Sequence, residues 1–213
     1  MQRINKDYIY ELIKNLAEKS KTDLDELEKY ADENNVPIVT KEVANFLRLI
    51  IKLKKPRKIL EFGTAIGYSG ILMLNESKDA HLTTVEINED MFHIAKENFK
   101  QYGFSKNVKQ ILDDGKIAVD YLNEKFDIIF IDSDKGHYKD YFVRVINLLE
   151  KDGIIILDNV LYKGMVACED LVPKSHRTIA NNMRDFLEYV CDKDEFISSV
   201  LPLGDGIMLV MRK

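Results

Sequence analysis

The stretch RKILEFGTAIGYSGILML, residues 57–74, decides the fold of this chain. It opens with a short apolar segment, RKILEF, that is typical of a buried strand. Two glycines, Gly63 and Gly67, follow, and a helix-like segment runs on from residue 68 to 77. A strand that passes through a glycine-bearing turn into a helix is the first unit of an α/β sheet. We therefore expect the alternation to continue.

Four further segments repeat this pattern. The apolar strands are HLTTVEI (81–87), NVKQIL (107–112), FDIIFI (126–131) and GIIIL (153–157), and the helix-like segments that follow them lie near 89–102, 115–124, 138–150 and 176–190. Their continuous apolar character predicts strands that are buried on both faces, as in a parallel sheet covered by helices. The pattern indicates a doubly wound α/β fold.

The two ends of the chain depart from the alternation. Before residue 56 the sequence predicts three helices, at 6–19, at 22–34 with a Thr22/Asp23 cap, and at 41–54 with a Thr40 cap. At the other end, FISSVLPLGDGIMLVMRK offers two strands joined at residues 204–206, which predicts a hairpin with an antiparallel edge strand. We expect one domain over residues 1–213, in which 1–55 form a helical lid or oligomer region and 56–213 form the core.

Composition narrows the function classes. The net charge of -5 gives no electrostatic case for non-specific nucleic-acid binding. The charged N-terminus does not resemble a signal peptide, and no run is long enough to span a bilayer. Cys168 and Cys191 are the two cysteines, and they lie too far apart for a local metal or redox motif. We expect a cytoplasmic protein without membrane contact.

The first strand end has the features of a nucleoside site. Gly63 and Gly67 allow a tight turn and close approach of a ligand, although an ordinary strand-to-helix turn would look the same. Glu86 ends the second strand and could accept hydrogen bonds from both hydroxyls of a ribose. Ala65 interrupts the dinucleotide fingerprint, which favours a cofactor without phosphates such as S-adenosylmethionine. Asp114 could meet the adenine or could simply cap a helix.

Oxygen-bearing side chains follow the fourth and fifth strands. Asp132 ends one, and Asp158 with Asn159 ends the other. The carboxyl ends of parallel strands meet at one edge of a sheet, and two carboxylates and an amide suit Mg²⁺. The alternative is that Asp158 and Asn159 are turn formers. Lys135 lies three residues past Asp132, where it could act as a general base or be a surface lysine.

Five motifs in order, EFGTAIGYS, VEIN, FIDSDKGHY, LDNVLYKGMV and GDGIMLV, resemble the metal-dependent O-methyltransferases of the catechol and caffeoyl-coenzyme A type. The resemblance covers nearly the whole chain. Within that family the sequence is most similar to the bacterial branch that includes the tRNA 5-hydroxyuridine methyltransferase. The resemblance implies a Rossmann-like, mostly parallel seven-stranded sheet and a homodimer.

The resemblance also implies site residues. The metal ligands fall on Asp132, Asp158 and Asn159, and the catalytic lysine falls on Lys135. The cofactor contacts fall on Val39, Glu61, Gly63, Ser69, Glu86, Asp114, Gly115 and Asp132. The implied cofactors are S-adenosylmethionine and Mg²⁺ or another hard divalent cation.

These features lead to a functional expectation and its alternatives. We expect a Mg²⁺-dependent methyltransferase of class EC 2.1.1 that converts 5-hydroxyuridine in tRNA, at the wobble position by resemblance, to 5-methoxyuridine. The alternative substrate is a small catechol-like or caffeoyl-type phenol. Both offer a hydroxyl beside a second oxygen, which a metal could chelate. Two hypotheses from other functional classes remain. One is a cofactor-binding protein without catalytic activity, and a more distant one is a nicotinamide dehydrogenase.

Overall fold

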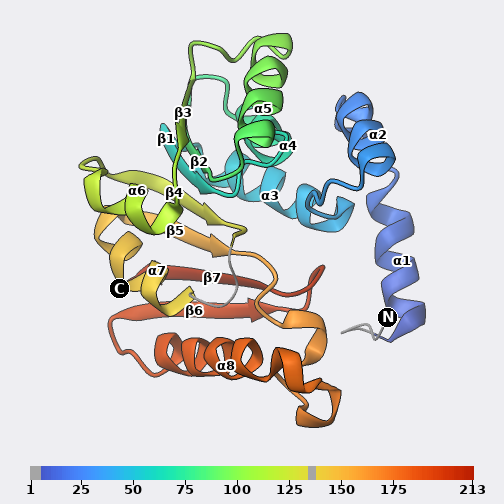
Figure 1. Cartoon of the computed structure of the whole chain (residues 1–213), viewed down its shortest axis with the longest axis vertical. Helices are drawn as coiled ribbons and strands as arrows, with labels where there is room; N and C mark the ends of the chain where they lie inside the picture. The colour runs from blue at the N-terminus through green and yellow to red at the C-terminus, as the bar shows by residue number, and fades with distance from the viewer. Residues whose placement is uncertain (1–5, 134–137) are drawn as a thin grey trace. The chain divides into compact units, whose positions relative to one another are not determined.

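The computed structural model describes residues 6–133 and 138–213 (Figure 1). By its internal contacts the chain divides into two compact parts. One part consists of residues 12–122, and the other of residues 123–213 together with the start of the chain up to residue 11. The predicted single domain with a boundary at residue 55 stays a prediction.

Among the described residues, the first part carries three strands and six α-helices, the first of which begins in the other part, before residue 12. Its sheet has the order β3-β2-β1, and both pairs are parallel. The elements in chain order are α1 (Asp7–Ala17), α2 (Asp25–Asn34), α3 (Lys41–Lys54), β1 (Lys58–Phe62), α4 (Tyr68–Glu76), β2 (His81–Glu86), α5 (Glu89–Gln101), β3 (Val108–Leu112) and α6 (Gly115–Tyr121). The register sets Glu61 of β1 beside Thr84 of β2.

The second part carries four strands in the order β4-β5-β7-β6. Its elements are β4 (Phe126–Ile131), α7 (Tyr138–Val145), η2 (Ile146–Leu148), β5 (Leu149–Leu157), η3 (Tyr162–Gly164), η4 (Glu169–Leu171), η5 (Lys174–His176), α8 (Arg177–Cys191), β6 (Phe196–Leu201) and β7 (Ile207–Arg212). β4 and β5 are parallel, whereas β7 runs antiparallel to both β5 and β6. Helix α8 lies along β6 (Figure 1).

The seven strands confirm the predicted fold class, a mostly parallel α/β sheet that ends in an antiparallel hairpin. The central strands are buried as the apolar runs predict, and β4 buries all but Asp127. The edge strand β3 is the exception, because none of its residues is fully buried. An edge strand has one neighbour, so its apolar run does not report burial on both faces.

Several element boundaries differ from the sequence prediction, among them those of α2, α7 and β5. The Thr22/Asp23 cap is wrong, because α2 begins after Leu24, which makes no side-chain cap. The hydroxyl of Thr22 instead donates to Glu28 at 3.4 Å. The predicted helix 138–150 ends at Val145, and the chain is already extended from Leu149. Pairing of Leu149 with Phe126 of β4 overrides the local helical pattern there.

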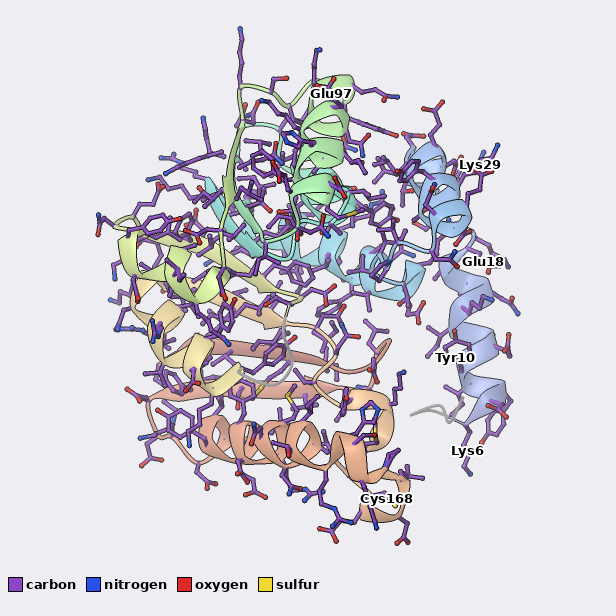
Figure 2. The ribbon with its side chains drawn as sticks, in the orientation of Figure 1. Lys6, Tyr10, Glu18, Lys29, Glu97 and Cys168 are labelled. Atoms are coloured by element: carbon purple, nitrogen blue, oxygen red, sulfur yellow. The ribbon has the colours of Figure 1, made fainter. Side chains whose placement is uncertain are left out.

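Two predicted absences can be examined over the described residues. None of the helices in residues 6–133 and 138–213 is both long and apolar enough to cross a membrane. Cys168 and Cys191 are free thiols, and both are exposed. Cys168 lies in the segment before α8 (Figure 2), at the opposite end of that helix from Cys191. The two cysteines therefore do not form a disulfide with each other in this structure.

Candidate functional site

The turn between β1 and α4 is built around left-handed backbone. Gly63, Ala65 and Gly67 have φ values of 100°, 45° and 85°. Glycine adopts such angles without cost, but alanine does not, so Ala65 must be held by its surroundings. Its N–H donates to Glu86 Oε2 at 2.8 Å, which supplies that hold.

Glu86 is fixed on both oxygens. Oε2 accepts from Ala65 N and Oε1 accepts from Asn88 N, each at 2.8 Å. The side chain is half-buried at the end of β2. A carboxylate offers about four lone-pair sites, so these two bonds leave capacity for further donors. The arrangement is compatible with a carboxylate that accepts two ribose hydroxyls beside a glycine turn, and the predicted role of Glu86 stays a prediction.

Glu61 and Ser69 lie beneath the turn. Glu61 is fully buried, and its two carboxylate oxygens accept from Ser69 Oγ and Thr84 Oγ1, both at 2.6 Å. The Thr84 hydroxyl also contacts that of Thr64 at 2.5 Å. Hydroxyl donors offset part of the cost of burying a carboxylate. In this arrangement Glu61 and Ser69 join the first turn of α4 to β1, and their predicted cofactor contacts are not tested.

The remaining predicted cofactor residues, Asp114, Gly115 and Val39, also belong to the part made of residues 12–122. Asp114 caps α6, because its side chain accepts from Lys116 N at 2.8 Å. This is the capping role that the sequence left open, and it does not exclude a ligand. Gly115 is the first residue of α6, and Val39 is buried just before α3. Asp113 N donates to the Glu86 carbonyl at 3.0 Å, which brings these two strand ends together.

The second part gathers the predicted metal ligands. Asn159 Nδ2 donates to Asp132 Oδ1 at 2.7 Å, and Asn159 N donates to Asp158 Oδ1 at 2.6 Å. Asp158 is buried, whereas Asp132 and Asn159 are partly exposed. Tyr138 at the start of α7 is buried and donates its hydroxyl to the Asp158 carbonyl at 2.8 Å. Asp132 and Asn159 therefore meet through their side chains where β4 and β5 end, and the Asp158 carboxylate lies on the backbone beside them.

The donor chemistry of this cluster fits a hard cation. Two carboxylates and one amide are oxygen ligands of the kind that Mg²⁺ prefers. Among the described residues no group of three or more His, Cys, Asp or Glu side chains could hold a metal. The cluster here has two carboxylates, and its third member is an amide. Ser133 Oγ, next to Asp132, is buried and has no hydrogen-bond partner within the part of the chain that the structure describes. Lys135 lies outside the described residues.

Sequence reasoning missed three contributors. Thr84 of the neighbouring strand donates its hydroxyl to Glu61. The sequence signal that could have predicted this bond is a hydroxyl residue within an otherwise apolar strand. Glu28 of α2 accepts from Tyr68 at 2.8 Å and from Lys41 at 2.6 Å. Burial and then the Glu28 carboxylate raise the pKa of Tyr68 above its ordinary value. Asp205, interpreted only as part of a hairpin turn, bonds the segment that follows Asn159. Nothing local in the sequence pairs these residues.

Comparison with known proteins places this architecture. The O-methyltransferase family profile matches residues 14–213, nearly the whole chain. The chain belongs to the O-methyltransferase family. The family match confirms the prediction that the protein is an O-methyltransferase. The branch that methylates 5-hydroxyuridine in tRNA finds no support in the comparisons.

Three relatives of this O-methyltransferase illustrate the likeness. A Staphylococcus aureus structure, provisionally named a caffeoyl-CoA O-methyltransferase, is 31% identical with a TM-score of 0.89, and covers 97% of this chain and 100% of its own. An Arabidopsis thaliana protein with the same provisional name is 29% identical over 95% of this chain and 87% of its own. An O-methyltransferase from Bacillus cereus, solved with S-adenosylhomocysteine, is 25% identical with a TM-score of 0.79, and covers 91% of this chain and 92% of its own.

Proposed function

We propose that this O-methyltransferase moves the methyl group of S-adenosylmethionine to a ring hydroxyl of a catechol-like or caffeoyl-type phenol, with Mg²⁺ or another hard divalent cation. The observation that carries the proposal is the contact of Asp132 with Asn159 at 2.7 Å, beside Asp158. The names of the Staphylococcus aureus and Arabidopsis thaliana relatives support the phenolic substrate. The S-adenosylhomocysteine bound to the Bacillus cereus relative supports the methyl donor.

Each part of the chain contributes its own residues. Gly63, Glu86 and Asp114, with Val39, Glu61, Ser69 and Gly115, bind and orient the cofactor. Asp132, Asp158 and Asn159 would hold the cation, and Asp132 would also lie against the cofactor. A bound Mg²⁺ lowers the pKa of a chelating hydroxyl. Lys135 takes the proton of the hydroxyl that is methylated. Transfer is a direct displacement, so its rate depends on alignment of the hydroxyl oxygen with the methyl group.

A second candidate is the 5-hydroxyl of uridine in tRNA. The ordered motifs AIGYS, DKGHY and DNVLYKGMV favour it by resemblance to the tRNA branch. The 5-hydroxyl lies next to the O4 carbonyl, so the same chelating geometry would serve. The net charge of -5 weighs against a polyanionic substrate. Arg184 of α8 is already paired with Glu169 at 3.5 Å. The cytoplasmic location and the homodimer also stay predictions.

Transfer of labelled methyl distinguishes these substrates. The purified enzyme would receive labelled S-adenosylmethionine and Mg²⁺ with catechol, with caffeoyl-CoA, or with bulk tRNA that bears 5-hydroxyuridine. Label in catechol or caffeoyl-CoA alone is the expected result. Label in the tRNA alone would move the proposal to the second candidate. Failure to label any oxygen acceptor, despite tight S-adenosylmethionine binding, would favour the non-catalytic alternative.

A further inference from the structure

The segment after β5, residues 159–164, has an unusual backbone. Asn159, Tyr162, Lys163 and Gly164 have φ values of 62°, 45°, 56° and 80°. Asparagine and glycine tolerate such angles, but a tyrosine and a lysine there are uncommon and cost about 1–3 kcal/mol each. Strain of this size persists only where the surroundings determine the conformation.

The hairpin turn between β6 and β7 supplies those surroundings. Leu161 N donates to the Asp205 carbonyl and Val160 N to the Gly206 carbonyl, each at 3.0 Å. Lys163 N donates to the Asp205 carboxylate at 2.5 Å. Two residues of the turn thus accept three backbone N–H groups of the strained segment. Of these three bonds, the one to the Asp205 carboxylate holds Lys163, the residue of the three that lies farthest from Asn159.

The same turn also packs closely against the segment. Gly206 has a φ of 92°, and a Cβ built there would lie 2.4 Å from Leu161 Cγ. The approach of the two loops therefore requires glycine. Asp205 is half-buried between Gly204 and Gly206, and its carboxylate accepts from Lys163 N.

The contacts of Asp205 and Gly206 hold the segment that directly follows the candidate metal ligands. Val160 and Leu161 directly follow Asp158 and Asn159, and Tyr162 N donates back to the Asn159 carbonyl at 3.3 Å. A change in the backbone of residues 160–163 would therefore turn the side chain of Asn159, which meets Asp132 at 2.7 Å. Partners that orient a ligand without touching the metal commonly alter its affinity by about 10–100-fold.

We propose that Asp205 is a positioning residue that holds Asp158 and Asn159 in the arrangement that binds a divalent cation. The inference rests on the proposed function, and it assigns to the C-terminal hairpin a role beyond closing the sheet. In this role the Asp205 carboxylate accepts from the backbone N–H of Lys163. It acts through the conformation of residues 159–163.

Asp205→Ala and Asp205→Asn test the role. The alanine variant loses the acceptor for Lys163 N, whereas asparagine keeps an acceptor oxygen. We expect Asp205→Ala to weaken Mn²⁺ binding, measured by electron paramagnetic resonance, by about tenfold or more. We expect Asp205→Asn to recover most of that loss. The S-adenosylmethionine Kd should stay within about twofold in both variants, because the cofactor residues other than Asp132 lie in the first part of the chain.

Asp192→Ala is the matched control, since Asp192 is an exposed aspartate of the same part, at the end of α8. Hydrogen exchange at the Leu161 and Lys163 amides provides a second readout, and Asp205→Ala should speed it while Asp192→Ala should not. Wild-type Mn²⁺ affinity in a folded Asp205→Ala would overturn the inference and leave the proposed function intact. Absence of Mn²⁺ binding in the wild type would overturn both the inference and the metal part of the proposed function.

Discussion

At the scale of single residues, the turn after β1 depends on backbone that only some residues can adopt. Gly67 has a φ of 85°, and an added Cβ would lie 3.2 Å from the ring of Phe99. Gly103 has a φ of 81°, and an added Cβ would meet nothing within 4 Å. The two glycines therefore share a conformational requirement and differ in the space around them.

This pair yields a matched prediction. Gly103→Ala should lower the free energy of unfolding by about 1–2 kcal/mol, the cost of a left-handed alanine. Gly67→Ala should lower it further, because the Phe99 ring must also move. Urea unfolding of both variants measures the difference. Gly67→Ala should also weaken S-adenosylmethionine binding, whereas Gly103→Ala should not. An equal effect of the two substitutions on S-adenosylmethionine affinity would contradict the proposed placement of the cofactor.

The Tyr138 hydroxyl offers a second test at this scale. Tyr138→Phe removes the donor to the Asp158 carbonyl and leaves a buried acceptor without it. We expect a loss of about 1–3 kcal/mol in the free energy of unfolding. The Mg²⁺ concentration for half-maximal activity should rise, since Asp158 loses an anchor. Unchanged stability and unchanged metal dependence would show that this bond does not hold Asp158 in place.

At the scale of elements, α3 and α4 are joined by a charged contact. Glu76 at the end of α4 accepts from Arg48 Nε at 2.6 Å and lies 3.1 Å from Lys52 Nζ, both on α3. Partial burial acts to raise the pKa of Glu76, but Arg48 and Lys52 outweigh it, and the pKa falls below the ordinary value of 4.5. The ionised carboxylate is therefore favoured in the folded state.

The sign of the pH dependence follows from this lowered pKa. Glu76 contributes stability above the pKa it has in the unfolded chain, and that contribution is lost as the pH falls through its lower folded pKa. Glu76→Gln should cost at most about 1 kcal/mol at pH 7, since solvent screens such pairs. The difference from wild type in urea unfolding should shrink towards pH 3. A constant difference between pH 7 and pH 3 would rule out the ion pair as its source.

The network around Glu28 links three elements to the cofactor turn. Glu28 of α2 accepts from Lys41 of α3 and from Tyr68 of α4, the residue after Gly67. Glu28→Ala should therefore weaken S-adenosylmethionine binding severalfold, and Glu28→Gln should do so less because it keeps an acceptor. Glu33→Ala, on the same helix and in an exposed position, is the control. Calorimetry that gave one Kd for all of these proteins would show that α2 does not position the turn.

The elements also show what the sequence could predict. The apolar runs located the strands, and two strand patterns joined at residues 204–206 predicted the antiparallel end, because both predictions depend on local patterns. The early start of β5 at Leu149 was missed, because pairing with β4 decides it. The contact of Asp132 with Asn159 followed from strand ends that share an edge. The partners of Asp205 and Glu28 lie 42 and 40 residues away, at Lys163 and Tyr68, and no spacing rule relates them.

At the scale of the whole molecule, the two compact parts carry different halves of the proposed chemistry. Most candidate cofactor residues belong to residues 12–122, and the candidate metal ligands belong to residues 123–213. S-adenosylhomocysteine should therefore slow hydrogen exchange mainly in residues 63–67 and 86–88. Mg²⁺ should slow it mainly in residues 158–164. Protection of the same segments by both ligands would contradict this division of roles.

Dependence of methyl transfer on a divalent cation tests the central claim most directly. The enzyme would be freed of metal with EDTA, and the rate of labelled methyl transfer to catechol would be followed as Mg²⁺ is added back. The account predicts negligible transfer without the cation, recovery with Mg²⁺, and no recovery in Asp158→Ala, whose S-adenosylmethionine Kd should match that of wild type. Undiminished transfer in EDTA, or full activity of Asp158→Ala, would contradict it.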